Sequence, residues 1–155
     1  MIDLENNFNV DLKSNKYYFT SEHVLYGKLR PYLNKVALPT CEGVCSTDIF
    51  PIIPIKNFSN KHFVKYLMSS PYFVQMTSSK TSGANLPRIG TKALELIPVI
   101  CPDIKIQEQF AQKAIEIENY IQEQEEELEN AKQMFQSLLH HAFTGELTRR
   151  AYGKD

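Results

Sequence analysis

The sequence contains no long run of apolar residues, and this lack excludes the simplest kind of membrane protein. No apolar stretch approaches the roughly eighteen residues that a helix needs to cross a bilayer. Met1 is followed by Asp3 and Glu5, whereas a secretory signal begins with a basic segment and continues with an apolar one. We therefore expect a cytoplasmic protein that has no membrane partner.

Cysteine is scarce, with three residues in the chain, Cys41, Cys45 and Cys101. An odd number of cysteines without an export signal favours reduced thiols. Cys41 and Cys45 are spaced too widely for a CxxC redox pair, and no His and Cys pairs stand at zinc-binding spacing. The carboxylates between Glu123 and Glu129 are more typical of a solvated helix face than of a metal site. We predict no metal and no cofactor.

The motifs of common catalytic centres are also missing. The glycines at positions 27, 43, 83 and 90 are isolated, so they form neither a dinucleotide-binding GxGxxG pattern nor a phosphate-binding GxxxxGK[ST] loop. No Asn-Pro-Pro-Tyr methyl-transfer motif is present, and none of the four histidines stands in a Ser/His/Asp order. We predict that the chain is not an enzyme, has no catalytic residues, and relies on a partner for chemistry.

What the sequence does contain is an apolar stripe along its last third, spaced alternately three and four residues apart. Phe110 lies one turn before the stripe, and the face opposite it is strongly acidic. Such a helix of about 36 residues is roughly 54 Å long, too long to bury its stripe on a domain of a hundred residues. We predict that it pairs with another long helix through Ala114, Ile117, Ile121, Gln124, Leu128, Ala131, Phe135 and Leu138.

Length and local pattern predict an α+β fold. The 155 residues, 43% of them hydrophobic, suffice for one modest core. We expect a small mixed, mainly antiparallel sheet with short helices, in a body of residues 1–102, then a long coiled-coil helix, 103–145, and a tail, 146–155. Strands are predicted over 17–29, 35–38, 49–55 and 97–100, with 49–55 at an edge or a bulge because of its prolines. Short helices are predicted over 61–68, capped by Ser59 or Asn60, and over 71–78, capped by Ser70 with Pro71 in the first helical position, and Asp103 should cap the long helix. The apolar residues of the two short helices are predicted as core: Phe63, Val64, Leu67, Phe73, Val74 and Met76.

The charge is divided unevenly along the chain. Residues 13–92 hold eleven Lys or Arg against three acids, whereas the chain from Gln107 onward holds five basic residues against ten acids. A basic body on an acidic helix is typical of a polyanion-binding domain, although surface lysines are also ordinary solvation. Arg suits guanine, Asn suits adenine, and Lys or Ser suits phosphate. Our candidate DNA contacts, some of which can instead brace turns, are Lys28, Arg30, Lys35, Lys80, Thr81, Ser82, Asn85, Arg88 and Lys92.

Four segments, in this order, resemble one protein family. They are VLYGKLRPYLNK (24–35), EGVCSTDIFPI (42–52), LPRIGTKALELIPVICPDIKIQEQ (86–109) and AFTGELTRR (142–150). Together they resemble the C-terminal part of a target recognition domain and the conserved spacer helix of the specificity subunit of type I restriction-modification enzymes. The resemblance runs from about Tyr18 to Arg150.

The resemblance implies a DNA-reading specificity subunit that binds double-stranded DNA and docks methyltransferase subunits and, through them, restriction subunits. In that family two recognition domains are separated by two long antiparallel helices. One domain and one helix imply a half subunit that begins inside the recognition domain and binds DNA weakly alone. Its helix would pair with a second specificity half or as an antiparallel homodimer. Two alternatives stay open: a coiled-coil adapter without DNA-reading activity, and an accessory domain of a nuclease or methyltransferase.

Overall fold

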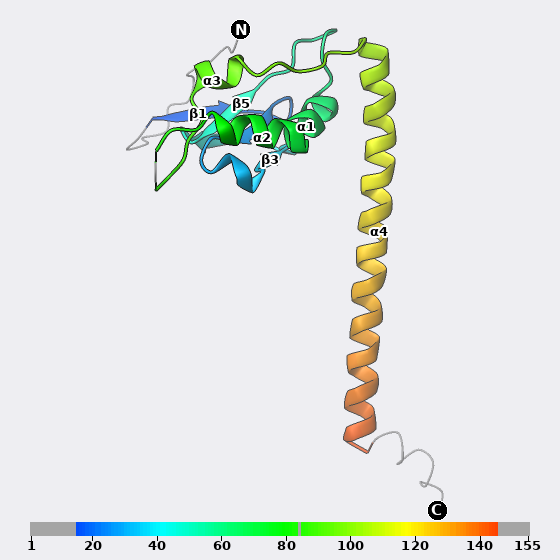
Figure 1. Cartoon of the computed structure of the whole chain (residues 1–155). Coiled ribbons are helices and arrows are strands. Elements are labelled where there is room, and N and C mark those ends of the chain that lie inside the picture. Colours follow the sequence, from blue (N-terminus) through cyan, green and yellow to red (C-terminus); the bar gives the residue numbers. More distant parts are fainter. Residues whose placement is uncertain (1–14, 84, 146–155) are drawn as a thin grey trace, which may run out of the picture. The chain divides into compact units, whose positions relative to one another are not determined.

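The computed structural model describes residues 15–83 and 85–145. The chain divides into two compact units, Met1–Gln112 and Lys113–Asp155. We call the described residues of the first the head and those of the second the helical unit (Figure 1). The predicted tail, 146–155, which includes the ELTRR part of the last matching segment, lies outside the described residues.

Two small antiparallel sheets form the framework of the head. Strand β1 (Lys16–Phe19) pairs with β4 (Gly43–Ser46), and the second sheet has the order β3 (Val36–Ala37), β2 (Val24–Gly27), β5 (Ile49–Ile52). Pro51 of β5 lies opposite Leu25 of β2. Among the described residues, β5 pairs with no strand other than β2. Because proline has no N–H to donate to a further strand, its edge position is as predicted.

Two short helices begin where side chains cap them. Helix α1 (Lys61–Ser69) starts after Asn60, whose Oδ1 accepts hydrogen bonds from the backbone N–H of His62 and Phe63. Helix α2 (Pro71–Ser79) starts after Ser70, whose Oγ accepts from the N–H of Phe73, and Pro71 takes the first helical position. Both caps satisfy N–H groups that have no partner within the helix, as the sequence predicts.

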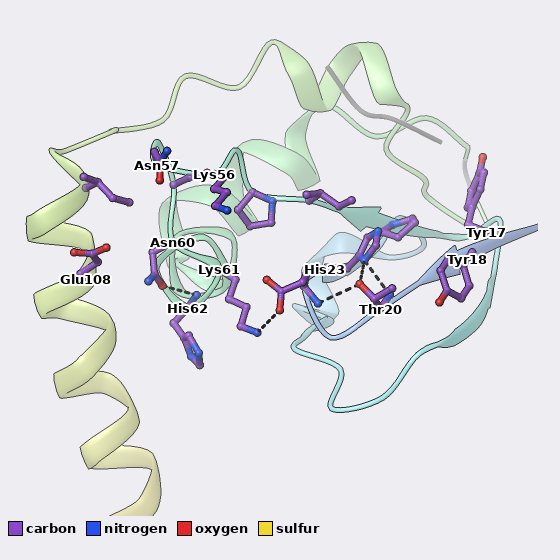
Figure 2. Close-up of a pocket in the computed structure, with 16 residues that line it drawn as sticks. Tyr17, Tyr18, Thr20, His23, Lys56, Asn57, Asn60, Lys61, His62 and Glu108 are labelled. Atoms are coloured by element: carbon purple, nitrogen blue, oxygen red, sulfur yellow. Dashed lines mark hydrogen bonds and ion pairs between the residues drawn. The ribbon is translucent and has the colours of Figure 1, made fainter. Parts of the chain in front are cut away.

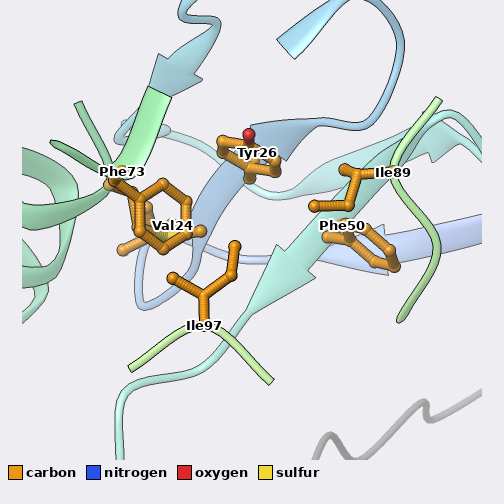
Figure 3. Close-up of a cluster of buried hydrophobic side chains, with 7 residues drawn as sticks. Val24, Tyr26, Phe50, Phe73, Ile89 and Ile97 are labelled. Carbon is orange, nitrogen blue, oxygen red and sulfur yellow. The ribbon is translucent and has the colours of Figure 1, made fainter. Parts of the chain in front are cut away.

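Buried side chains from both sheet and helices meet in one cluster between them (Figure 3). Tyr26 of β2 and Phe73 of α2 contact edge to face, with ring centroids 5.8 Å apart. The full cluster is Val24, Tyr26, Phe50, Met68, Phe73, Ile89 and Ile97. Val64 and Met76, predicted as core, are partly buried against it, whereas Phe63 packs on Phe110 instead.

Three elements differ from the prediction. The strand predicted over 97–100 is wrong: Ile97 enters the core, but Pro98 has no N–H and no neighbouring strand pairs with this segment within the described residues. Strand β4 and the short helix α3 (Thr91–Glu95) were not predicted. Gly90 precedes α3 and provides no side-chain cap, so the usual signal of a helix start is absent.

Helix α4 (Ile104–Phe143) is 40 residues long, which corresponds to about 60 Å. It begins after Asp103, as predicted, and the Asp103 carboxylate accepts a hydrogen bond from the N–H of Lys105 at 2.9 Å. The expected α+β architecture, with one long C-terminal helix, is confirmed.

Candidate nucleic-acid interface

Two of the predicted DNA-contacting segments lie side by side at the end of β2. The chain after β2 pairs with a loop before α3 through an isolated bridge between Leu29 and Arg88. The N–H of Arg30 donates to the carbonyl of Pro87 at 2.8 Å, and the N–H of Ile89 donates to the carbonyl of Lys28 at 3.1 Å. Residues about sixty positions apart in the sequence therefore share one surface.

The loop itself is closed at its base. Ser82 and Arg88 exchange two backbone hydrogen bonds, of 3.0 and 2.9 Å. Gly83 has φ +97°, and a Cβ added there would lie 3.1 Å from the carbonyl oxygen of Leu86. A residue with a side chain is strained in this conformation, so Gly83 permits the turn. We call Ser82, Gly83 and Asn85–Arg88 the closed loop.

The charged side chains beside the closed loop are partly paired. Arg88 Nη2 lies 3.4 Å from Asp48 Oδ2, and the Arg88 side chain is 54% exposed. Asp48, in the turn before β5, also accepts a hydrogen bond at its backbone carbonyl from the N–H of Lys28. The aspartate orients Arg88 but leaves much of the guanidinium open to solvent. No motif in the sequence marked Asp48, because its role depends on the pairing of distant segments.

Lys28 faces inward as much as outward. Its Nζ lies 4.1 Å from the centroid of the Phe50 ring and 5.4 Å from that of Tyr17. Burial lowers the pKa of Lys28, while the charge of Asp48 acts in the opposite direction. Lys28 therefore makes cation–π contacts with the rings of Phe50 and Tyr17.

Arg30 is held in an unusual backbone conformation. It has φ 52° and ψ 67°, in the left-handed region, and precedes the short 3-10 helix η1 (Pro31–Leu33). Non-glycine residues seldom adopt this region, and where they do the strain is often associated with function. The side chain of Arg30 is exposed beside the closed loop.

The remaining predicted contacts are more scattered. Lys80 ends α2, and the hydroxyl of Thr81 already donates to the carbonyl of Ser78 at 2.9 Å. Lys92 lies on α3, and Lys35 follows η1, where its carbonyl accepts from Gly27. Asn85 is exposed, and its amide makes no hydrogen bond to another described residue. The structure thus brings together Lys28, Arg30, Ser82 and Arg88, but shows no contact that joins Lys35, Lys80 or Lys92 to them.

A hollow of about 880 Å³ lies elsewhere in the head (Figure 2). It is lined by none of the nine predicted DNA contacts. Its cations and acids are balanced: Lys61 lies 3.5 Å from Glu22, and Lys56 and Glu108 also line the wall. A polyanion is not favoured in a balanced hollow.

His23 is the most buried polar group on the wall of this hollow. It is 7% exposed, and its Nδ1 accepts a hydrogen bond from the N–H of Thr20 at 3.0 Å. Burial lowers the pKa of His23, and the backbone contact with Thr20 and the charge of Glu22 oppose this only in part. The imidazole is therefore held in its neutral form.

A second hollow, of about 610 Å³, is mainly apolar and lies beside α1. Phe63 and Tyr66 of α1 contact Phe110 edge to face, and the hydroxyl of Tyr72 donates to the carbonyl of Pro98 at 3.0 Å. The residues that line this hollow include no cationic side chain.

Gln107 is a residue that the sequence analysis missed. It is 0% exposed. Its Oε1 accepts from the N–H of Asn60 at 3.0 Å, and its Nε2 donates to the carbonyls of Phe58 and Pro102 at 3.1 and 2.8 Å. All three hydrogen bonds lie within the head, so Gln107 fixes the first turns of α4 to the segment that caps α1. In the sequence, the only hint of this role is that Gln107 places an amide side chain among the charged residues at the start of the long helix.

The apolar stripe of the helical unit is exposed. Ile117, Ile121, Leu128, Phe135 and Leu138 are 60%, 50%, 56%, 58% and 54% exposed. Ala131 and Gln124 are exposed between them, whereas Ala114 is already buried, so the uncovered stripe begins at Ile117. Gln124 donates to Glu127 at 3.1 Å. Apolar exposure of this extent on one helix face marks an interaction surface.

Two other kinds of site are absent from residues 15–83 and 85–145. No cluster of three or more His, Cys, Asp or Glu residues in this part of the chain could hold a metal ion. None of its helices is both long and apolar enough to cross a membrane.

Comparison with known proteins finds a curated relative and solved structures of similar fold. The type I restriction enzyme EcoDI specificity subunit of Escherichia coli is 34% identical over 139 residues, which cover 87% of this chain and 31% of that protein. The crystal structure of the HsdS subunit from Thermoanaerobacter tengcongensis superposes with a TM-score of 0.60 at 23% identity, covering 82% of this chain and 33% of that one. The chain therefore spans about a third of each. No protein-family model matches it.

Proposed function

The chain belongs to the family of type I restriction enzyme specificity subunits, and on this basis we propose that its head reads one half of a split double-stranded DNA site. The observation that carries the proposal is the surface at the end of β2, where the exposed Arg30 and Arg88 flank the closed loop. The described part of this loop supplies an uncommitted amide at Asn85. Asparagine suits the edges of bases, and arginine binds both bases and phosphates, so this surface carries the groups that recognition of DNA requires.

We assign the chain no catalytic role in this proposal. Methyltransferase subunits would perform the chemistry and restriction subunits would join through them, so the DNA-reading chain supplies specificity. Near the loop, the carboxylate of Asp48 is paired with Arg88, and the carbonyl of Asp48 accepts a hydrogen bond from the N–H of Lys28. A positive, exposed rim of this kind suits DNA phosphate.

The test is a titration of the full chain against a fluorescent double-stranded DNA of about 30 base pairs at several salt concentrations. The logarithm of the binding constant should fall linearly with the logarithm of salt, with a slope of about −0.9 for each phosphate contacted. Arg88→Gln or Lys92→Gln should weaken binding by about 1 kcal/mol or more. Lys132→Gln, on the helical unit, is the matched control that leaves binding unchanged.

Absence of DNA binding even at low salt would exclude this function. It would favour the second candidate, a coiled-coil adapter, which the exposed stripe of the helical unit supports independently. The two candidates are thus separated by one titration.

The stripe supports pairing with a second copy of the chain as an antiparallel homodimer, or with a second specificity half. In an antiparallel pair centred between Gln124 and Leu128, Ile117 would face Phe135 of the other copy and Ile121 would face Ala131. Apolar residues of the two copies would then meet along the stripe. Gln124 would lie close to the two-fold axis, where a polar residue can fix the register of the two helices. Two identical heads suit inverted half sites.

Spin labels distinguish the orientation of the pair. Labels introduced at Glu126, which is level with the axis, should give the shorter distance, whereas labels at His140 should be offset along the helices by about 42 Å, twice fourteen residues at 1.5 Å each. A parallel pair would give similar short distances at both positions. Equal distances would therefore contradict the antiparallel arrangement.

Methyltransferase docking is supported by a widening of the apolar surface toward the end of α4. Met134, Leu139 and Phe143 lie outside the two-helix stripe and are 74%, 39% and 87% exposed. A second helix would cover the stripe but not all of these residues, so they remain available to a third chain. Met134→Glu with Phe143→Glu should abolish co-purification with a methyltransferase subunit while the chain still dimerises.

A further inference from the structure

We propose that Leu86 and Asn85, in the closed loop, together read an adenine- and thymine-containing edge of the DNA major groove. The inference rests on the proposed function, because it assumes that the head binds double-stranded DNA. Leu86 is not among the DNA contacts predicted from the sequence, since an isolated leucine in a polar loop carries no recognition signal. It would be the specificity-determining residue of this surface.

The loop that carries these two residues is tied to its surroundings by backbone hydrogen bonds. Reciprocal hydrogen bonds between Ser82 and Arg88 close its base, and Arg30 holds Pro87 through a backbone hydrogen bond of 2.8 Å. The residue that follows the loop, Ile89, is 1% exposed in the core cluster. Recognition needs side chains held in place by a fixed support, because each immobilised group then costs less ordering on binding.

The exposed groups suit one kind of base pair. Asn85 has an amide that makes no hydrogen bond to another described residue, and an asparagine amide matches the N6 and N7 atoms of adenine. Leu86 is 47% exposed although it is apolar, and apolar side chains contact the methyl group of thymine. The N6 and N7 atoms of adenine and the methyl group of thymine all lie in the major groove. Asn85 and Leu86, which are neighbours in the chain, would therefore contact the same groove.

The charged residues beside the loop have a different task. Arg30 and Arg88 lie at its base, and Arg88 forms an ion pair with Asp48. Contacts from the base to phosphates would hold the head on any DNA sequence, while Asn85 and Leu86 would distinguish sequences. Affinity and selectivity should therefore respond to different substitutions.

The experiment selects bound molecules from a double-stranded library with twenty randomised base pairs, using the full chain, and sequences the pool before and after selection. Wild type should enrich a motif that contains adenine and thymine. Asn85→Ala with Leu86→Ala should reduce the enrichment of that motif about tenfold, with less than about a twofold change in affinity for the unselected pool and no change in salt slope. Lys92→Gln should weaken binding to both pools. Leu96→Ala removes an equally apolar side chain, 74% exposed outside the loop, and should leave the motif intact.

The inference is overturned if the double variant enriches the same motif as wild type, or if wild type binds the library without enriching any motif. In the first case the proposed function stands, because wild type still selects a sequence. In the second case the head binds DNA without reading its sequence, so the proposed function falls with the inference. Wild type that fails to bind the library at low salt would overturn the inference together with the proposed function.

Discussion

In the head, Val24, Tyr26 and Ile89 are at most 1% exposed, whereas in the helical unit Ile117, Leu128 and Phe135 are between 56% and 60% exposed. The head thus contains a buried core of its own, whereas the helical unit presents its apolar stripe to solvent. The difference teaches that the two units depend on different things for stability. The head depends on internal packing, and the helical unit depends on a partner.

Truncation of the head core should have the largest effect on stability. Phe73 is 4% exposed and packs edge to face on Tyr26. Phe73→Ala should lower the free energy of unfolding of the head by about 3 to 5 kcal/mol, because it removes buried area and leaves a cavity. Urea unfolding followed by tyrosine fluorescence measures this loss. The matched control, Phe143→Ala, removes an 87% exposed ring and should change the head by less than about 0.5 kcal/mol.

The next effect concerns the joint between the start of α4 and the segment that caps α1. Gln107→Ala should destabilise the head by about 2 to 4 kcal/mol, because it removes a buried side chain and three partly buried backbone groups lose their hydrogen-bond partner. Gln109→Ala is the control, since Gln109 is exposed two residues away. Equal stability of the two variants in urea would show that the Gln107 hydrogen bonds contribute little.

Strain at Arg30 gives an effect of opposite sign. Arg30→Gly should raise the free energy of unfolding by about 0.5 to 1 kcal/mol, because glycine adopts the left-handed conformation of this residue without steric cost. The same variant should weaken DNA binding. A loss of stability would mean that the Arg30 side chain contributes to folding, and would remove the argument that the head keeps strain for function.

The pH response of the head should be the smallest effect. Burial lowers the pKa of His23 below its ordinary value of 6.5, so the unfolded chain takes up a proton before the folded chain does. Stability should be complete above pH 6.5 and fall as the pH decreases through the lowered pKa. His23→Gln should make the stability difference between about pH 7.5 and about pH 5.5 smaller. His140→Gln on α4 should leave it as in wild type, and an unchanged difference in His23→Gln would contradict this role.

Local signals in the sequence predicted the elements that local physics determines. The caps at Asn60, Ser70 and Asp103, the edge position of β5 and the long helix all depend on residues within one turn or one strand. Strand β4 could not be predicted from its own residues, because its pairing with β1 depends on a register across some thirty positions. The strand expected over 97–100 failed for the converse reason: its apolar residues enter the core or face solvent without a neighbouring strand.

The candidate interface was predictable in composition but not in arrangement. The sequence marked Arg30, Ser82 and Arg88 by residue type, and the backbone bonds between the two segments place them together. Lys28 has the same chemistry in the sequence, yet it lies over the Phe50 ring. The sequence did not mark Asp48, Gln107 or Leu86 as candidate residues. The contacts of Asp48 and Gln107 are with residues far away in the sequence, which no local pattern identifies.

The central claim, that the head is self-sufficient and the helical unit requires a partner, is tested most directly by sedimentation of the full chain at tens of micromolar. Wild type should sediment as a dimer, and Leu128→Asp with Phe135→Asp should raise the dimer dissociation constant at least about a hundredfold, or about 2.7 kcal/mol. The head should unfold at the same urea concentration in both. Gln133→Asp with Gln136→Asp adds the same charge outside the stripe and should stay dimeric. A stable, soluble wild-type monomer would contradict the account.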